Sequence, residues 1–145
     1  MLASSEIVSP DQRALMNAHS AVSGEHHAAI LDALVENCFD SVIITEAAPG
    51  NSIAYVNKAF TDLTGYAPEE VLGKSPSFLQ GSATDATVLQ RLHADMAAGR
   101  VFEGKAVNYR KDGSAFTMWW RVIPVIGSSG QPVCFVAFQR EAHSL

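Results

Sequence analysis

Three alternating apolar segments, separated by two turn sequences, fill the last third of the chain and constrain its fold most. The segments are VFEGKAVNYR (101–110), AFTMWWRVIPV (115–125) and PVCFVAFQRE (132–141). Asp112-Gly113 and the Ser-Ser-Gly-Gln stretch 128–131 between them are typical of tight turns. Strands joined by such short turns pair antiparallel, so this region predicts a three-stranded meander.

The first two thirds of the chain add strands and short helices to this meander. Residues 41–45 and 53–57 are β-branched or alternating runs around a Pro-Gly-Asn turn, which predicts a hairpin. Helical spacing and capping residues predict helices over 26–37, 58–64, 68–72 and 85–98, whereas 74–82 is expected to be irregular. The whole predicts an α+β domain with a five-stranded antiparallel sheet and short helices on one face.

The chain divides in composition near residue 25. Residues 1–25 hold few large apolar residues, and Ser9-Pro10 before Asp11 is a helix-start pattern. This extension is therefore either a helical cap or a loose tail. Residues 26–145 form the predicted domain.

Composition excludes several functional classes. The chain of 145 residues carries a net charge of −5, which disfavours a nucleic-acid surface. No apolar run approaches the ~20 residues of a transmembrane helix, and the N-terminal residues lack a secretory pattern. Cys38 and Cys134 have no CxxC or metal-ligand spacing, so we expect two reduced core thiols in a cytoplasmic protein that binds no membrane.

Strand alternation places polar amides on an apolar face. Phe135, Ala137 and Gln139 share one face of the last strand, and Asn108 interrupts an earlier strand in the same way. Buried amides need partners, because an unsatisfied one costs roughly 1–3 kcal/mol. They bond either to loop backbone or near a sheet edge, or they meet a planar polar ligand together with Gln80.

The sequence shows no pattern typical of an enzyme. The histidines are scattered, no nucleophile motif or phosphate-binding loop is present, and His26-His27 lacks further ligand-type partners. Alternation predicts that Trp120 faces the core and that Trp119 and Arg121 face outward. An exposed Trp119 would indicate a partner or dimer surface.

The chain resembles the PAS domains and, within them, the LOV photosensors. The segment IAYVNKAFTDLTGYAPEEVLGK (53–74) is similar to the early PAS motif, and GKSPSFLQG (73–81) lies where LOV domains have their GxNCRFLQ signature. NYRKDGSAF (108–116) and FVAFQRE (135–141) also match. The resemblance covers roughly residues 29–141 and implies a PAS fold.

The resemblance implies a flavin site that is only partly kept. LOV domains hold the polar edge of the flavin ring with amides, and Gln80, Asn108 and Gln139 stand at three of those positions. Ser75 and Met118 stand where the family has asparagines.

The reactive and charged positions of the family also differ here. Pro76 replaces the cysteine that forms the photochemical bond, and neither Cys38 nor Cys134 aligns with it. Ser77 and His93 replace two arginines that bind the flavin phosphate, and Arg91 could substitute only if its helical phase allows it.

These departures leave three hypotheses. The first is a sensory domain that binds FMN or FAD without an adduct and responds to light or redox state, with Gln139 as the reporter and Trp120 as a possible electron donor. The second is a dimerisation or small-ligand module without flavin, and the third is a flavoenzyme, which we disfavour. The predicted flavin-binding residues are Ile43, Thr45, Ser75, Pro76, Ser77, Leu79, Gln80, His93, Asn108, Met118, Trp120, Val122 and Gln139.

The resemblance also implies partners. PAS domains commonly pair through the outer sheet face and flanking helices, so we expect a homodimer through Trp119, Arg121 and the helical parts of 10–36. Because little chain follows the last strand, we expect either a short sensor acting alone or a part of a longer protein with a downstream signalling domain.

Overall fold

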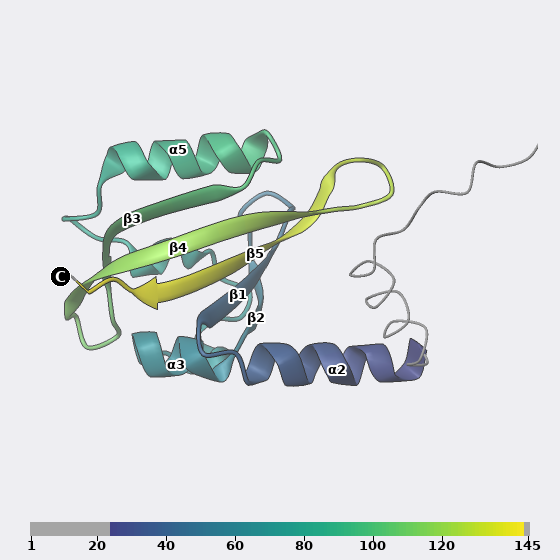
Figure 1. The fold of residues 1–145 in the computed structure, drawn as a ribbon. Coiled ribbons are helices and arrows are strands. Elements are labelled where there is room, and N and C mark those ends of the chain that lie inside the picture. The colour runs from purple at the N-terminus through teal and green to yellow at the C-terminus, as the bar shows by residue number, and fades with distance from the viewer. Residues whose placement is uncertain (1–23, 144–145) are drawn as a thin grey trace, which may run out of the picture. The chain divides into compact units, whose positions relative to one another are not determined.

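A five-stranded sheet with short helices is the architecture of this chain in the computed structural model, which describes residues 24–143 (Figure 1). Residues 9–19, one candidate helix of the extension, lie outside this range. The elements are α2 (Gly24–Glu36), β1 (Ser41–Glu46), β2 (Ile53–Val56), α3 (Lys58–Thr64), α4 (Pro68–Val71), the 3₁₀ helix η1 (Pro76–Leu79), α5 (Ala86–Ala97), β3 (Phe102–Tyr109), β4 (Ala115–Ile126) and β5 (Pro132–Glu141).

The sheet is antiparallel throughout, in the order β2-β1-β5-β4-β3. The predicted hairpin and meander are both confirmed. The hairpin and the meander are joined into one sheet by the pairing of β1, the first strand, with β5, the last. In this pairing Ser41 lies opposite Gln139, and Ile43 lies opposite Ala137. The central strand is therefore β5, although it is the last in the chain.

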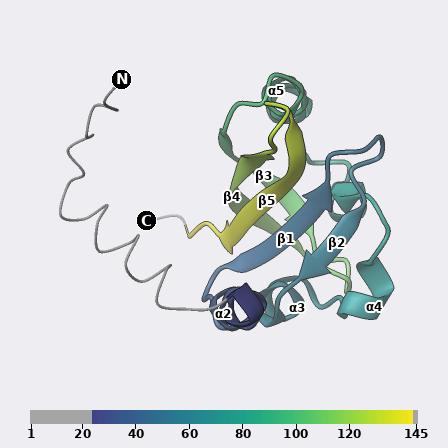
Figure 2. The same ribbon diagram turned by 90° about the vertical axis from the view of Figure 1, so that its right-hand side faces the viewer.

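The helix α5 contacts one edge of the sheet, and the helices α3 and α4 contact the strands at the other edge. α5 packs against β3, whereas α3 contacts β1 and α4 contacts β2. Figures 1 and 2 show α5 near one end of the sheet and α3 near the other, and Figure 2 shows α4 beside β2. The core is accordingly split into two clusters, one around Phe102 and Trp120 and one around Phe60 and Leu79.

One segment differs from its predicted structure. The stretch 74–82, expected to be irregular, contains η1. Pro76 occupies the first turn, where its missing N–H costs nothing, and the Ser75 hydroxyl accepts a hydrogen bond from the Ser77 N–H at 3.4 Å. A short 3₁₀ turn carries no helical periodicity long enough to be recognised in the sequence.

Asn57 fixes the region where β1 begins. Its Oδ1 accepts from the N–H groups of Val42 and Phe60, at 2.9 and 3.0 Å, and so caps α3. Its Nδ2 donates to the carbonyls of Val35 and Asp40, at 2.9 and 3.0 Å. One amide, only 1% exposed, thus uses its full hydrogen-bonding capacity to join three segments.

The first described helix, α2, runs across the boundary predicted between residues 25 and 26. That boundary stays a prediction. Within residues 24–143, no helix is long and apolar enough to span a bilayer.

Candidate functional site

A cavity of about 160 Å³ lies between the inner face of the sheet and the segments η1 and α5. It occupies the region between the two core clusters, since Ile43 belongs to one cluster and Leu92, Trp120 and Val122 to the other. Its walls are Ile43, Thr45, Asn51, Ser75, Pro76, Ser77, Gln80, Leu92, His93, Met96, Trp120, Val122, Ala137 and Gln139.

Most of the predicted flavin-binding residues are brought together by this cavity. Strand β1 contributes two of them, the η1 region four, α5 one, and strands β4 and β5 the remaining three. In chain order they are Ile43, Thr45, Ser75, Pro76, Ser77, Gln80, His93, Trp120, Val122 and Gln139.

Three predicted residues do not line the cavity. Leu79 is buried in the core cluster with Phe60, and Met118 is buried in the other cluster. Asn108 lies on the edge strand β3 and donates to the Ala106 carbonyl at 3.4 Å. Of the two alternatives given for this amide, a backbone partner near a sheet edge or a planar polar ligand, its position matches the first.

Four lining residues were not predicted as site residues. Leu92 and Met96 lie one turn apart on α5, within the helix predicted over 85–98, and Ala137 was predicted only as a member of the inner face of the last strand. The helical spacing of Leu92 and Met96 and the strand alternation at Ala137 place these side chains on inward faces, which could have indicated the cavity. Asn51 gave no signal, because it lies in the turn between β1 and β2.

Two glutamines reach the cavity from different elements, and they join other polar wall residues such as Thr45, Ser75 and His93. Gln139 on β5 is 4% exposed, and its Oε1 accepts from the buried Ser41 hydroxyl at 3.0 Å. The Gln80 side chain, at the end of η1, has no hydrogen-bond partner among residues 24–143. The Gln139 Nε2 likewise has none within that range. The site therefore offers amide donors and acceptors beside apolar walls.

Trp120 forms a fixed part of the apolar wall. It is 5% exposed, and its ring packs on Phe102 with centroids 5.0 Å apart at an angle of 51°. Such tilted aromatic pairs hold both rings in place.

Neither cysteine of the chain lines the cavity. Cys38 lies in the loop between α2 and β1, and Cys134 on β5 alternates with the inward-facing Phe135. Pro76 occupies the wall in the η1 region. Among the residues that the structure describes, no cluster of histidines, cysteines and acids could hold a metal ion.

Among residues 24–143, His93 is the one basic residue on the cavity wall. Arg91, two residues earlier, donates to the Glu103 carbonyl at 2.8 Å and lies over the Phe102 ring at 4.9 Å. It is therefore engaged at the β3 edge and does not line the cavity.

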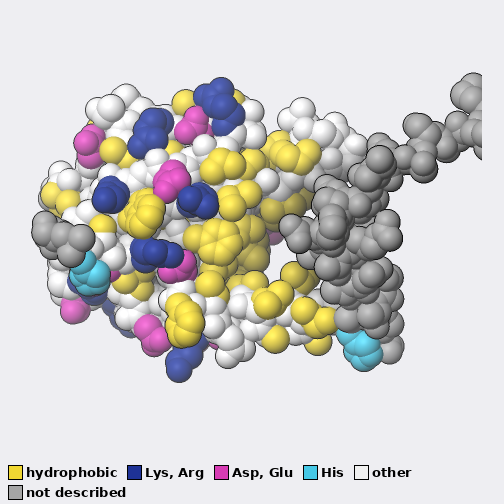
Figure 3. Space-filling view, in the orientation of Figure 1, with side chains coloured by type: hydrophobic (Ala, Val, Ile, Leu, Met, Phe, Trp, Pro, Cys, Tyr) yellow, Lys and Arg dark blue, Asp and Glu magenta, His cyan; other side chains and the backbone are white. Residues whose placement is uncertain are grey.

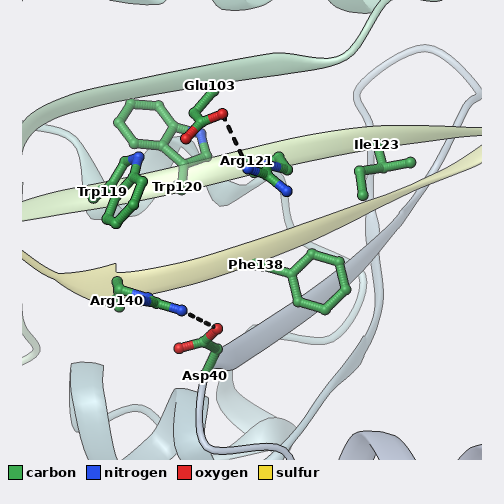
Figure 4. A pocket seen from close by; sticks show the side chains of 8 residues that line it. All are labelled: Asp40, Glu103, Trp119, Trp120, Arg121, Ile123, Phe138 and Arg140. Atoms are coloured by element: carbon green, nitrogen blue, oxygen red, sulfur yellow. Dashed lines mark hydrogen bonds and ion pairs between the residues drawn. The ribbon is translucent and has the colours of Figure 1, made fainter.

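The opposite face of the sheet carries a second hollow, of about 290 Å³ (Figure 4). As predicted, Trp119 and Arg121 lie on this outer face. Lys105 and Arg140 lie over the Trp119 ring, at 5.7 and 5.3 Å from its centroid.

Ion pairs border this outer hollow. Arg140 pairs with Asp40 at 2.8 Å and Arg121 with Glu103 at 3.2 Å. The hydrogen bond and charge of Asp40 raise the pKa of Arg140 above its usual value. Figure 3 shows basic, acidic and apolar side chains interspersed on this face.

Comparison with known proteins places these features in a family. A family model described as "PAS domain" matches residues 40–142. Phototropin-2 of Oryza sativa subsp. japonica is 36% identical over 100 residues, which cover 69% of this chain and 11% of that protein. Blue-light-activated histidine kinase 1 of Erythrobacter litoralis is 44% identical over 82 residues, covering 57% of this chain and 23% of the kinase.

A solved structure gives the same result. An RNA-binding light-oxygen-voltage receptor superposes with a TM-score of 0.78 at 27% identity, covering 83% of this chain and 34% of the receptor. The chain thus spans about a tenth to a quarter of the two curated relatives described above. Its fold, its matched family and these likenesses to LOV proteins agree, and we conclude that the chain belongs to the PAS domain family.

Proposed function

We propose that this chain is a sensory domain of the LOV type that binds a flavin non-covalently in the inner cavity and responds to light or redox state without a cysteinyl adduct. One observation carries the proposal. Gln80 and Gln139 bring amides with unused hydrogen-bonding capacity into a cavity whose walls also include apolar side chains such as Ile43, Trp120 and Val122. The likeness to blue-light proteins supports the same ligand class.

The residues present fit a flavin ring in chemistry. The polar ring edge of a flavin carries both donors and acceptors, and each glutamine amide offers both. The cavity, at about 160 Å³, is smaller than the roughly 300–1,000 Å³ of most ligand pockets. Binding therefore requires the wall to move, and the unbranched Met96 side chain is suited to this.

A bound flavin would supply light absorption and the exchange of electrons and a proton. The chain's own contribution is the Gln139 amide, which can present either its oxygen or its nitrogen to the ring. If the amide rotates, its oxygen leaves the Ser41 hydroxyl, which must then accept from Nε2 instead. A change in the cavity thereby reaches the first residue of β1 through a hydrogen bond.

Pro76 excludes the usual covalent chemistry at its position. A proline has no nucleophilic side chain, and no cysteine lines the cavity. Of the wall residues in the described part of the chain, His93 alone could supply a cation for a phosphate, since Arg91 is engaged elsewhere. This weak phosphate site favours FAD, whose phosphates extend further from the ring, over FMN.

Absorption spectroscopy of the purified protein tests the proposal. We expect a flavin band, with FMN and FAD distinguished by extraction and chromatography, and a Pro76→Ala variant with unchanged photochemistry. Gln80→Leu and Gln139→Leu should each weaken flavin affinity by about 2- to 12-fold, the equivalent of one net hydrogen bond. Gln131→Leu, at an exposed turn outside the cavity, is the matched control. A colourless protein that takes up neither flavin would refute the proposal.

The small cavity favours a second candidate function. A volume of about 160 Å³ suits a one- or two-ring ligand with a polar edge, and the family asparagines are absent at Ser75 and Met118. In that case the protein lacks flavin and binds a small heterocycle instead. Thermal-shift screening of small heterocyclic lactams against the flavin-free protein separates the two candidates.

We further propose that the domain acts without catalysis of its own, as a homodimer linked to a signalling partner. Trp119 and Arg121 on the outer face, and the exposed Leu31 and Leu34 of α2, are the proposed contacts. The rest of the predicted helical contact, before residue 24, lies outside the described residues. Light scattering of the parent and of Trp119→Ser measures the oligomeric state.

We propose that nucleic acid is not a partner of this domain, although one similar structure is titled as RNA-binding. The net charge is −5, and Arg121 and Arg140 on the outer face are already paired with acids. Binding to random RNA at physiological salt would contradict this.

A further inference from the structure

The chain has two tryptophans, and they are consecutive on β4. Alternation along the strand turns them to opposite faces of the sheet. Trp120 lines the inner cavity, and both tryptophans are among the residues that line the outer hollow (Figure 4). We propose that Trp119 and Trp120 form an electron-transfer pair that carries an electron from the outer face of the sheet to a flavin photoexcited in the cavity. This inference rests on the proposed function.

Trp120 is the inner member of the pair. It is part of the cavity wall, and its packing on Phe102 keeps the indole in place. In the first step one electron leaves the Trp120 indole for the photoexcited flavin. The indole is then a radical cation and the flavin holds one extra electron. With Trp120 alone, the electron would return to the ring it came from.

Trp119 provides the second step. The backbone of a single peptide unit separates the two residues, whose Cα atoms are therefore about 3.8 Å apart. Transfer of an electron from Trp119 to the Trp120 radical restores Trp120 and moves the oxidised site to the outer face. The half-buried Trp119 is in contact with solvent there.

The charges around Trp119 favour loss of its proton. Lys105 and Arg140 lie over the ring, and their positive charges disfavour a radical cation on the indole, so the electron leaves Trp119 together with the indole proton. The indole N–H has no acceptor among residues 24–143, so its proton passes to water. The product is a neutral Trp119 radical, which cannot take back the electron without also recovering a proton.

The balance of the proposed reaction is one electron and one proton. The electron moves from Trp119 to the flavin, and the proton moves to water. A thiol in solution then transfers a hydrogen atom to the neutral radical, restoring Trp119 and forming a thiyl radical that dimerises to a disulfide. Oxygen would take up the transferred electron from the flavin and form superoxide, which completes the cycle.

Transient absorption of the flavin-loaded protein tests the pair. We expect a long-lived neutral tryptophan radical in the parent, and its loss in Trp119→Phe, in which the electron returns rapidly to Trp120. Trp120→Phe should abolish both radical species. Tyr109→Phe, which removes an aromatic hydroxyl away from the cavity wall, is the control and should behave as the parent.

Peptide mapping provides a second measurement that does not depend on signalling output. After illumination in oxygen without thiol, oxidation products should accumulate on Trp119 in the parent and on neither tryptophan in Trp120→Phe. If flavin binds to all variants but Trp119→Phe keeps the long-lived radical, the pair is refuted while the proposed function stands. If none of the proteins binds flavin, the proposed function itself fails.

Discussion

Removal of the Asn57 side chain is the most direct test of how the cavity end of β1 is held. Asn57 is 1% exposed and makes four hydrogen bonds, two as donor and two as acceptor. The residue that follows its partner Asp40 is Ser41, whose hydroxyl donates to Gln139. An Asn57→Ala variant therefore removes hydrogen bonds that hold the chain beside Ser41, the partner of the cavity residue Gln139. Asn57 itself does not line the cavity.

The expected loss follows from the groups left without partners. The N–H groups of Val42 and Phe60, on residues only 1% and 0% exposed, lose their acceptor. Each buried unsatisfied group costs about 1–3 kcal/mol, and loss of a helix cap alone costs about 0.5–2 kcal/mol. The Val35 carbonyl keeps its bond from the Cys38 N–H. We expect a decrease of about 3–5 kcal/mol in the free energy of unfolding, a large part of the usual 5–15 kcal/mol.

Urea denaturation followed by circular dichroism measures this loss, with thermal unfolding as the second readout. A domain of this size should lose about 12–20 °C in Tm. Lys58→Ala is the matched control: the neighbouring residue is exposed, and its loss should change stability by no more than about 0.5 kcal/mol. A loss below about 1 kcal/mol in Asn57→Ala, with an unchanged m-value, would show that the four hydrogen bonds contribute little and would refute the reasoning.

Three further predictions concern the surroundings of the cavity and the domain surface. A Cβ at Gly81 would lie 2.3 Å from the Tyr109 ring, so Gly81→Ala should destabilise by about 1–3 kcal/mol, and by much less in a Tyr109→Ala background. Additive losses in the double mutant would contradict this. The Thr84 hydroxyl donates to a carbonyl of the edge strand β3 at 2.6 Å, so Thr84→Val should lose about 1–3 kcal/mol in urea denaturation while Thr84→Ser keeps the bond and the stability. The bond from Lys111, and then that from a backbone N–H, lowers the pKa of Glu70, so its contribution to stability is present above pH 4.5 and is lost as the pH falls through the lowered pKa. Lys111→Gln should flatten that part of the stability–pH curve, and an unchanged curve would show that the pair has no role.

Most of the inner face of the site could be predicted because strand alternation has a fixed period. Once residues 118–122 and 135–139 are assigned to strands, Trp120, Val122 and Gln139 must share a face with their inward neighbours. The same rule placed Trp119 outside. Alternation does not say which inward residues border a cavity and which fill the core. Met118 was grouped with the site because it stands where the LOV family has an asparagine, and the structure places it in the core.

The sequence alone determined the element types, the meander, the hairpin and the absence of a thiol at Pro76, because these depend on local period, turn residues and residue identity. The tertiary structure decided that β1 pairs with β5, which sets Ser41 opposite Gln139. It also decided that the two core clusters leave a cavity between them and that Arg91 turns to the β3 edge. These features depend on the packing of segments distant along the chain, and no local pattern encodes which side chains meet there.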